Sequence, residues 1–307
     1  MERFCKKTMS VNSETYERLL KKEIEIWSQY SGPEKSNTFE QRKQTLPYAT
    51  YRKGTIELEL EYIKKSGENI SVLELGSADG WLTNEIIKLG NVKDITSIDI
   101  SIDDNLKEKY NNKSIVLKGD LNKIEEISFE NKFDLIITHG TLHHLVDPQK
   151  TLKYCIDNLL KKGGIILIND TWILQSLQLK TNAFLYLFLN RLPHSIIKLN
   201  LKEFLKILFY KIPLTLFSKK FAGSIAHSHT TSPFESISSA DDYKSIYDRK
   251  DLKILCFRNF AALPGLQNSW SKSPKLLKNA IQKIDDFLIK KKLFVGDLHI
   301  CILKKIY

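Results

Sequence analysis

From residue 70 onward, short runs of β-branched and other apolar residues alternate with longer amphipathic stretches. The runs fall at 70–75, 95–100, 115–117, 133–138 and 165–168, and two more follow at 252–257 and 298–303. Strands separated by connections of helical length favour βαβ units, because neighbouring parallel strands need a crossover between them. We therefore predict an α/β fold with a doubly wound, mostly parallel sheet.

Helix signals support this prediction at several places. Asp147 is a typical N-cap, Pro148 suits the first helical position, and an apolar stripe follows; Lys161 and Lys162 would form the last turn, with Gly163 as a left-handed stop. A second helix is predicted over 14–28 from apolar residues at helical spacing. Residues 56–62 alternate between apolar side chains and Glu, which fits either a strand or a helix.

The alternation of strand and helix patterns is absent from residues 1–55 and 173–249, which suggests three parts. Residues 1–55 would form an N-terminal helical extension. Residues 56–172 and 250–307 would form the α/β domain. Residues 173–249 are apolar and aromatic and then rich in Ser, His and Thr, so we expect a helical cap inserted over the ligand-binding edge of the sheet.

Composition and charge limit the classes of function. The chain has 42% hydrophobic and 27% charged residues, as in ordinary globular proteins, and a formal net charge of +11. Its basic residues are scattered, and Lys290 to Lys292 is the only triplet, so solvated faces explain the charge better than a nucleic-acid site. Four distant cysteines, no secretory signal and no long apolar run predict a cytoplasmic protein.

The segment VLELGSADGWLT, residues 72–83, has the pattern of a strand, a sharp turn and a helix start. Gly76 and Gly80 can adopt positive φ and let a ligand approach the backbone, beside the free N–H groups of a helix N-terminus. A dinucleotide fingerprint would need glycine where Ala78 and Trp81 stand. This departure disfavours a nicotinamide oxidoreductase.

Acidic residues end the next two predicted strands. Asp99 follows the glycine turn by about twenty residues, the spacing of an acid that binds ribose, and its carboxylate could accept both ribose hydroxyls. Gly119, Asp120 and Leu121 end the third strand.

Residues Glu74 to Gly80 have the pattern Glu-x-Gly-x-x-x-Gly, and the two acids follow it in order. Two further segments come after them, FDLIITHGTLHHLVDP (133–148) and LLKKGGIILI (159–168). Together these features resemble class I S-adenosylmethionine-dependent methyltransferases of the small-molecule type. The family usually has glycine where Ala78 stands. The resemblance implies a seven-stranded Rossmann-like sheet with an antiparallel last strand, which 298–303 would supply. It also implies that Asp120 binds the adenine amine and Leu121 packs on the ring. The expected contacts to S-adenosyl-L-methionine are Glu74, Gly76, Ala78, Gly80, Asp99, Asp120, Leu121 and His139.

Methyl transfer is an in-line displacement that depends mainly on positioning, and a general base helps only when the acceptor must lose a proton. His139, His143 and His144 follow the fourth strand and are the candidate catalytic residues; a purely structural role stays open for each. His227 and His229 in the insertion are further candidates. No metal site is expected, because adjacent histidines point in different directions.

We therefore expect a methyltransferase that acts on oxygen or nitrogen of a small or lipophilic acceptor, because an apolar insertion suits a lid over a small ligand. An RNA methyltransferase and a non-catalytic S-adenosylmethionine-binding protein are the alternatives; a nucleic-acid partner is not expected. Within the insertion, Asn200 and Glu203 predict the start of an amphipathic helix that Pro213 would end. This segment either packs as a cap or makes a peripheral membrane contact and admits a lipophilic acceptor.

Overall fold

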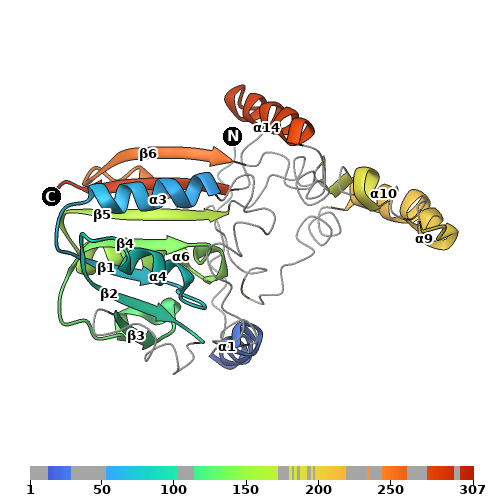
Figure 1. Ribbon diagram of the computed structural model, residues 1–307. Coiled ribbons are helices and arrows are strands. Elements are labelled where there is room, and N and C mark those ends of the chain that lie inside the picture. Colours follow the sequence, from blue (N-terminus) through green and yellow to red (C-terminus); the bar gives the residue numbers. More distant parts are fainter. Residues whose placement is uncertain are drawn as a thin grey trace.

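The computed structural model describes residues 13–28, 53–101, 114–171, 198–218, 244–260, 275–293 and 298–307, with shorter pieces at 180–181, 183–184, 187–191, 195 and 234. The described residues form a seven-stranded sheet in the order β3-β2-β1-β4-β5-β7-β6 (Figure 1). The strands are β1 (Ile70–Leu75), β2 (Val92–Asp99), β3 (Ser114–Lys118), β4 (Phe133–His139), β5 (Leu160–Thr171), β6 (Leu252–Phe260) and β7 (Leu298–Lys305).

The pairing of the strands confirms the predicted fold. Neighbours among β1 to β5 pair in parallel, whereas β7 runs antiparallel to both β5 and β6. The last strand of the chain is therefore the antiparallel one. The result is a doubly wound Rossmann-like sheet, to which residues from both sides of the predicted insertion contribute strands.

Two apolar layers cover the sheet, one on each face. In β1, Val72 belongs to one layer and Leu73 and Leu75 to the other, as the period of two in a strand requires. The helices α3 (Lys53–Lys65) and α4 (Trp81–Ile87) pack on the first face; α6 (Pro148–Tyr154), its π-helical continuation η5 (Cys155–Leu159) and α12 (Lys244–Tyr247) pack on the second. Both faces of the central strands β1 and β4 are buried, which is typical of parallel sheets.

The open alternative at residues 56–62 is decided in favour of a helix. In α3 the inward side carries Ile56, Glu59 and Ile63, at helical rather than alternating spacing, and all three are fully buried. The side-chain amide of Asn91 stabilises the end of this helix by donating to the carbonyls of Ile63 and Gly67, both at 2.8 Å. A carboxylate on the buried face of a helix is unusual, and Glu59 reappears at the functional site.

The helix after Asp147 begins as predicted but ends earlier. Asp147 accepts a hydrogen bond from Lys150 N–H at its N-cap, and Pro148 is the first residue. The prediction that Lys161 and Lys162 form its last turn is wrong, because Leu160 already pairs with Phe133 in the sheet. Gly163 does have a positive φ of 77°, but it lies in an irregular stretch of β5.

Helices outside the sheet layers lie mostly at the carboxyl ends of the parallel strands. The predicted helix at 14–28 is α1 (Ser13–Ser28), beside the ends of β2 and β3 (Figure 1). Farther out, α9 (Leu201–Lys206), the π-helical turn η7 (Ile207–Lys211) and α10 (Ile212–Phe217) follow one another. The expected end at Pro213 is wrong: the helix passes through it to Phe217, and the preceding π turn is wider than an α turn, which relieves the clash of the proline ring.

Candidate functional site

One pocket lies at the carboxyl ends of β1, β2, β3 and β4, where an open α/β sheet binds ligands. Its empty space, the open mouth included, is about 620 Å³. Seven residues predicted from the sequence line it, namely Gly76, Ala78, Asp99, Asp120, Leu121, His139 and His144. Glu74, Gly80 and His143 are not among the lining residues.

The turn after β1 depends on its backbone conformation. Gly76, Ala78 and Gly80 have φ values of +78°, +47° and +72°. A Cβ atom at Gly76 would lie 2.1 Å from Oγ1 of Thr141, so only glycine fits there. Ala78 adopts the left-handed conformation at some cost, and its N–H donates to Oδ2 of Asp99 at 2.8 Å. The turn is thus fixed by contacts from the ends of β2 and β4.

Asp99 is almost fully buried and well supplied with hydrogen-bond donors. Besides Ala78 N–H, it accepts from the N–H of Ser101 at 2.9 Å and from the Ser101 hydroxyl at 3.4 Å, both on Oδ1. Burial raises the pKa of Asp99, and these donors act in the opposite direction. The N–H of Ile100 adds to these donors, so the carboxylate is close to fully hydrogen-bonded.

Asp120 N-caps the 3₁₀ helix η3 (Leu121–Glu126). Its Oδ1 accepts from Asn122 N–H at 2.9 Å, while its Oδ2 accepts from the hydroxyl of Tyr16 on α1. The pKa of Tyr16 is raised well above its ordinary value, mainly by burial and next by the Asp120 carboxylate. The phenol therefore stays protonated and donates. The N-terminal helix is therefore attached to the predicted adenine site.

His139, the last residue of β4, is held by a carboxylate that the sequence analysis did not single out. Its Nδ1 lies 3.0 and 3.1 Å from the two carboxylate oxygens of the fully buried Glu59 on α3. Nδ2 of Asn169 on β5 lies 3.2 Å from the same atom, and Trp81 packs edge-on at 5.3 Å between ring centroids. With Nδ1–H donating to Glu59, Nε2 is the ring nitrogen that can accept a proton.

The adjacent histidines His143 and His144 have different environments. Nδ1 of His143 lies 2.5 Å from Oδ1 of Asp170 on β5, whose other oxygen accepts from Leu142 N–H, so this imidazole is held by β5 outside the pocket lining. His144 lines the pocket, and among the described residues its buried Nδ1 has no hydrogen-bond partner. The pKa of His144 is lowered well below its ordinary value, mainly by burial and next by the neighbouring His143, so the ring is neutral.

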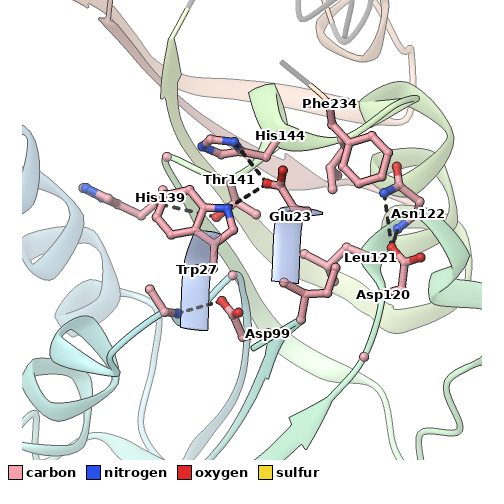
Figure 2. Close-up of a pocket in the computed structure, with 16 residues that line it drawn as sticks. Glu23, Trp27, Asp99, Asp120, Leu121, Asn122, His139, Thr141, His144 and Phe234 are labelled. Atoms are coloured by element: carbon pink, nitrogen blue, oxygen red, sulfur yellow. Dashed lines mark hydrogen bonds and ion pairs between the residues drawn. The ribbon is translucent and has the colours of Figure 1, made fainter. Parts of the chain in front are cut away.

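Residues distant in sequence complete the pocket. Figure 2 shows Glu23 and Trp27 of α1 between His144 on one side and Asp99 on the other, and Phe234 near Asn122. Trp27 Nε1–H donates to Glu23 at 2.7 Å, while Glu23 lies 3.6 Å from Nδ1 of His144, too far for a hydrogen bond. The spacing of apolar residues predicted the helix α1 but not that it would cover this pocket. His227 and His229 lie outside the described residues.

Within the part of the chain that the structure describes, no three His, Cys, Asp or Glu side chains are grouped to hold a metal ion. Likewise, none of its helices is long and apolar enough to cross a bilayer.

Glu74 lies behind the turn rather than in the pocket, where it accepts hydrogen bonds from the hydroxyls of Thr83 and Ser97. Burial raises its pKa to about 7. The native state therefore keeps this proton to a higher pH than the unfolded chain does. The free energy of unfolding should consequently fall by roughly 3 kcal/mol between pH 4.5 and 7 on account of this residue.

Glu74→Gln should remove that decline, because an amide stays neutral and can keep both hydrogen bonds. Urea denaturation at a series of pH values measures the difference between variant and wild type. Glu61→Gln, an exposed position on α3, is the control and should leave the slope unchanged. Parallel pH profiles for Glu74→Gln and wild type would contradict the buried, protonated carboxyl.

Part of the chain matches a known protein family. Residues 66–207, from just before β1 into η7, match the model of a family described as "Methyltransferase domain". No curated protein matches the chain. Similar solved structures include a putative sarcosine dimethylglycine methyltransferase from Galdieria sulphuraria, at 13% identity and a TM-score of 0.46, with 83% of this chain and 85% of that chain covered.

Another is the plantazolicin methyltransferase BpumL, solved with a pentazolic desmethylPZN analog and SAH; it is 17% identical with a TM-score of 0.45, and the match covers 96% of this chain and 99% of that chain. The matched segment and the fold are those of an S-adenosylmethionine-dependent methyltransferase, consistent with the class I Rossmann-like type, and S-adenosylmethionine is the cofactor.

Proposed function

We propose that this enzyme transfers a methyl group to oxygen or nitrogen of a small or lipophilic acceptor. The observation that carries the proposal is one pocket bordered by Asp99, Asp120 and His139, from three successive strand ends. When bound, S-adenosylmethionine supplies an electrophilic methyl group on a sulfonium. The protein then has to hold the acceptor against that methyl and, where necessary, remove a proton.

The cofactor contacts in this proposal follow the strand ends. Oδ2 of Asp99 accepts a hydrogen bond from one ribose hydroxyl, rather than from both hydroxyls. Oδ2 of Asp120 accepts hydrogen bonds from both the adenine amine and the Tyr16 hydroxyl, and Leu121 covers one face of the adenine ring. The turn from Gly76 to Gly80 lies along the amino-acid part of the cofactor, with Ala78 in contact and Gly80 shaping the backbone. Glu74 acts through the turn, not through direct contact.

His139 is the proposed general base, and Glu59 is its positioning residue. Glu59 accepts the hydrogen of Nδ1 and so keeps Nε2 free to take the proton of a hydroxyl or amine. His144 is the second candidate base. Its ring is neutral, and its buried Nδ1 can accept a hydrogen bond from the hydroxyl or amine of the substrate that receives the methyl group. His143 is assigned a structural role, since Asp170 binds it away from the pocket lining.

The lining of the pocket supports a small or lipophilic acceptor. Beside its carboxylates and histidines, the pocket has five large apolar side chains, which suit an apolar ligand; they are Trp27, Ile100, Leu121, Leu145 and Phe234. In this proposal the N-terminal extension 1–55 and the insertion 173–249 form the cover, and residues 56–172 with 250–307 form the cofactor-binding domain.

Removal of the Asp99 carboxylate should weaken cofactor binding. Asp99→Ala would leave a ribose hydroxyl unpaired and release the N–H of Ala78, which costs about 1.5–3 kcal/mol, or roughly 10- to 150-fold in Kd for S-adenosylmethionine. Calorimetric titration measures this. Asp94→Ala, in the same strand but outside the pocket, should bind normally; equal affinities for wild type and Asp99→Ala would overturn the ribose assignment.

The imidazole–carboxylate pair gives a kinetic prediction. His139→Asn should lower kcat by about 10²–10⁴-fold, and Glu59→Gln by a smaller factor, with cofactor affinity retained in both. The exposed neighbour Glu61→Gln is the control for Glu59 and should keep the wild-type kcat. An unchanged kcat in His139→Asn, or a comparable loss only in His144→Asn, would refute His139 as the base.

The class of acceptor can be tested without knowing the compound. The enzyme is incubated with cofactor carrying a labelled methyl group and, separately, with the small-molecule, lipid and RNA fractions of a cell extract. We expect label in the small-molecule or lipid fraction, and mass spectrometry of the product identifies the methylated atom. The Asp99→Ala variant serves as the background control. Label confined to RNA would establish the RNA methyltransferase alternative, and cofactor binding without label in any fraction would support a non-catalytic protein.

A further inference from the structure

The segment from Leu201 to Phe217 is a helical arm that projects from the body of the molecule. Its three pieces, α9, η7 and α10, join without leaving helical φ and ψ at Lys206 and Lys211. Asn200 caps its start by accepting from Glu203 N–H at 3.0 Å. In Figure 1 the arm lies beyond the carboxyl ends of the strands, farther from the sheet than the other labelled helices.

One side of the arm exposes large apolar side chains. Leu201, Leu205 and Phe209 recur every fourth residue and are 67%, 42% and 72% exposed, respectively. Further exposed apolar residues stand before and after them, namely Leu199, Tyr210, Leu216 and Phe217. The opposite side is buried at Ile207 and Thr215. The arm therefore has an inner side that packs and an apolar outer side, whereas an ordinary surface helix is polar on its outside.

A row of lysines borders this apolar row. Lys202 and Lys206 each follow a member of the row by one residue, and they are exposed. The single acid of the arm, Glu203, is paired with Lys211 at 2.6 Å, so it does not offset the charge of the outer side. Lys198 adds another exposed cation just before the helix. Apolar side chains beside cations on one face are the pattern of helices that lie in a membrane interface.

We infer that the outer side of this arm docks on an anionic lipid surface. The apolar row would enter the boundary between headgroups and acyl chains, and the lysine stems would lie along it with their ammonium groups among the phosphates. The positive charge favours lipid over a second copy of this chain, since two such faces would bring their lysines together. The inference goes beyond the proposed function and does not require a lipophilic acceptor.

Vesicle flotation tests the inference with the full-length protein. The protein should float with vesicles of phosphatidylcholine and phosphatidylserine at low salt, and less with phosphatidylcholine alone or at high salt. Leu205→Ser/Phe209→Ser should reduce the bound fraction at least tenfold. The matched control is Ile115→Ser/Ile306→Ser, which removes two exposed apolar side chains remote from the arm and should float like wild type.

The charge row is tested in the same way. Lys202→Glu/Lys206→Glu should reduce binding to the anionic vesicles severalfold, whereas Lys93→Glu/Lys153→Glu, with the same change in net charge on exposed residues elsewhere, should not. All variants should keep their affinity for S-adenosylmethionine, so failure here is distinct from failure of the proposed cofactor site. Protein that stays at the bottom of the gradient at low salt, or arm variants that float like wild type, would overturn the inference. A dimer in sedimentation velocity that Leu205→Ser/Phe209→Ser dissociates, without vesicle binding, would assign the face to a second copy instead.

Discussion

The hydrogen bond from Ala78 N–H to the buried carboxylate of Asp99 is the contact on which the pocket depends. It joins the end of β2 to the turn that follows β1. A residue with a Cβ atom pays about 1–2 kcal/mol for the left-handed conformation of Ala78, and a hydrogen bond to a charged group, at about 1.5–3 kcal/mol, is sufficient to offset this. Asp99 both holds the turn and lines the pocket. A change at Asp99 therefore alters the conformation of the turn and the lining of the pocket together.

The main features of the fold were predictable because they depend on topology. In a parallel sheet the carboxyl ends of successive strands meet at one edge, so residues that end predicted strands must come together. Asp99, Asp120 and His139 end predicted strands, and all line one pocket, whereas the cofactor roles of Asp120 and His139 came from the family resemblance. Glu74 illustrates the limit of the approach. Its place in the motif is typical of the family, but its side chain lies behind the turn, bonded to Thr83 and Ser97, which only the packing of α4 against the sheet determines.

Local patterns were least informative where tertiary contacts compete with them. The alternation of Ile56, Leu58 and Leu60 fits a strand as well as a helix, and only the helical structure brings Glu59 to the buried face beside His139. The helix after Asp147 has lysines suited to its last turn, but pairing of Leu160 with Phe133 ends it sooner. The contact between Tyr16 and Asp120 spans 104 residues and has no local signal at all.

The distribution of charge explains why this pocket suits a sulfonium cofactor better than a dinucleotide. The chain carries a net charge of +11, but the pocket is lined by the carboxylates of Glu23, Asp99 and Asp120, and none of its described lining residues is lysine or arginine. The neutral imidazole of His144 does not compensate them. A pyrophosphate would be repelled by such a lining, whereas a sulfonium cation is complemented by it. The excess lysine lies outside, and part of it borders the apolar row of the arm, where an anionic surface rather than the cofactor is the complementary partner.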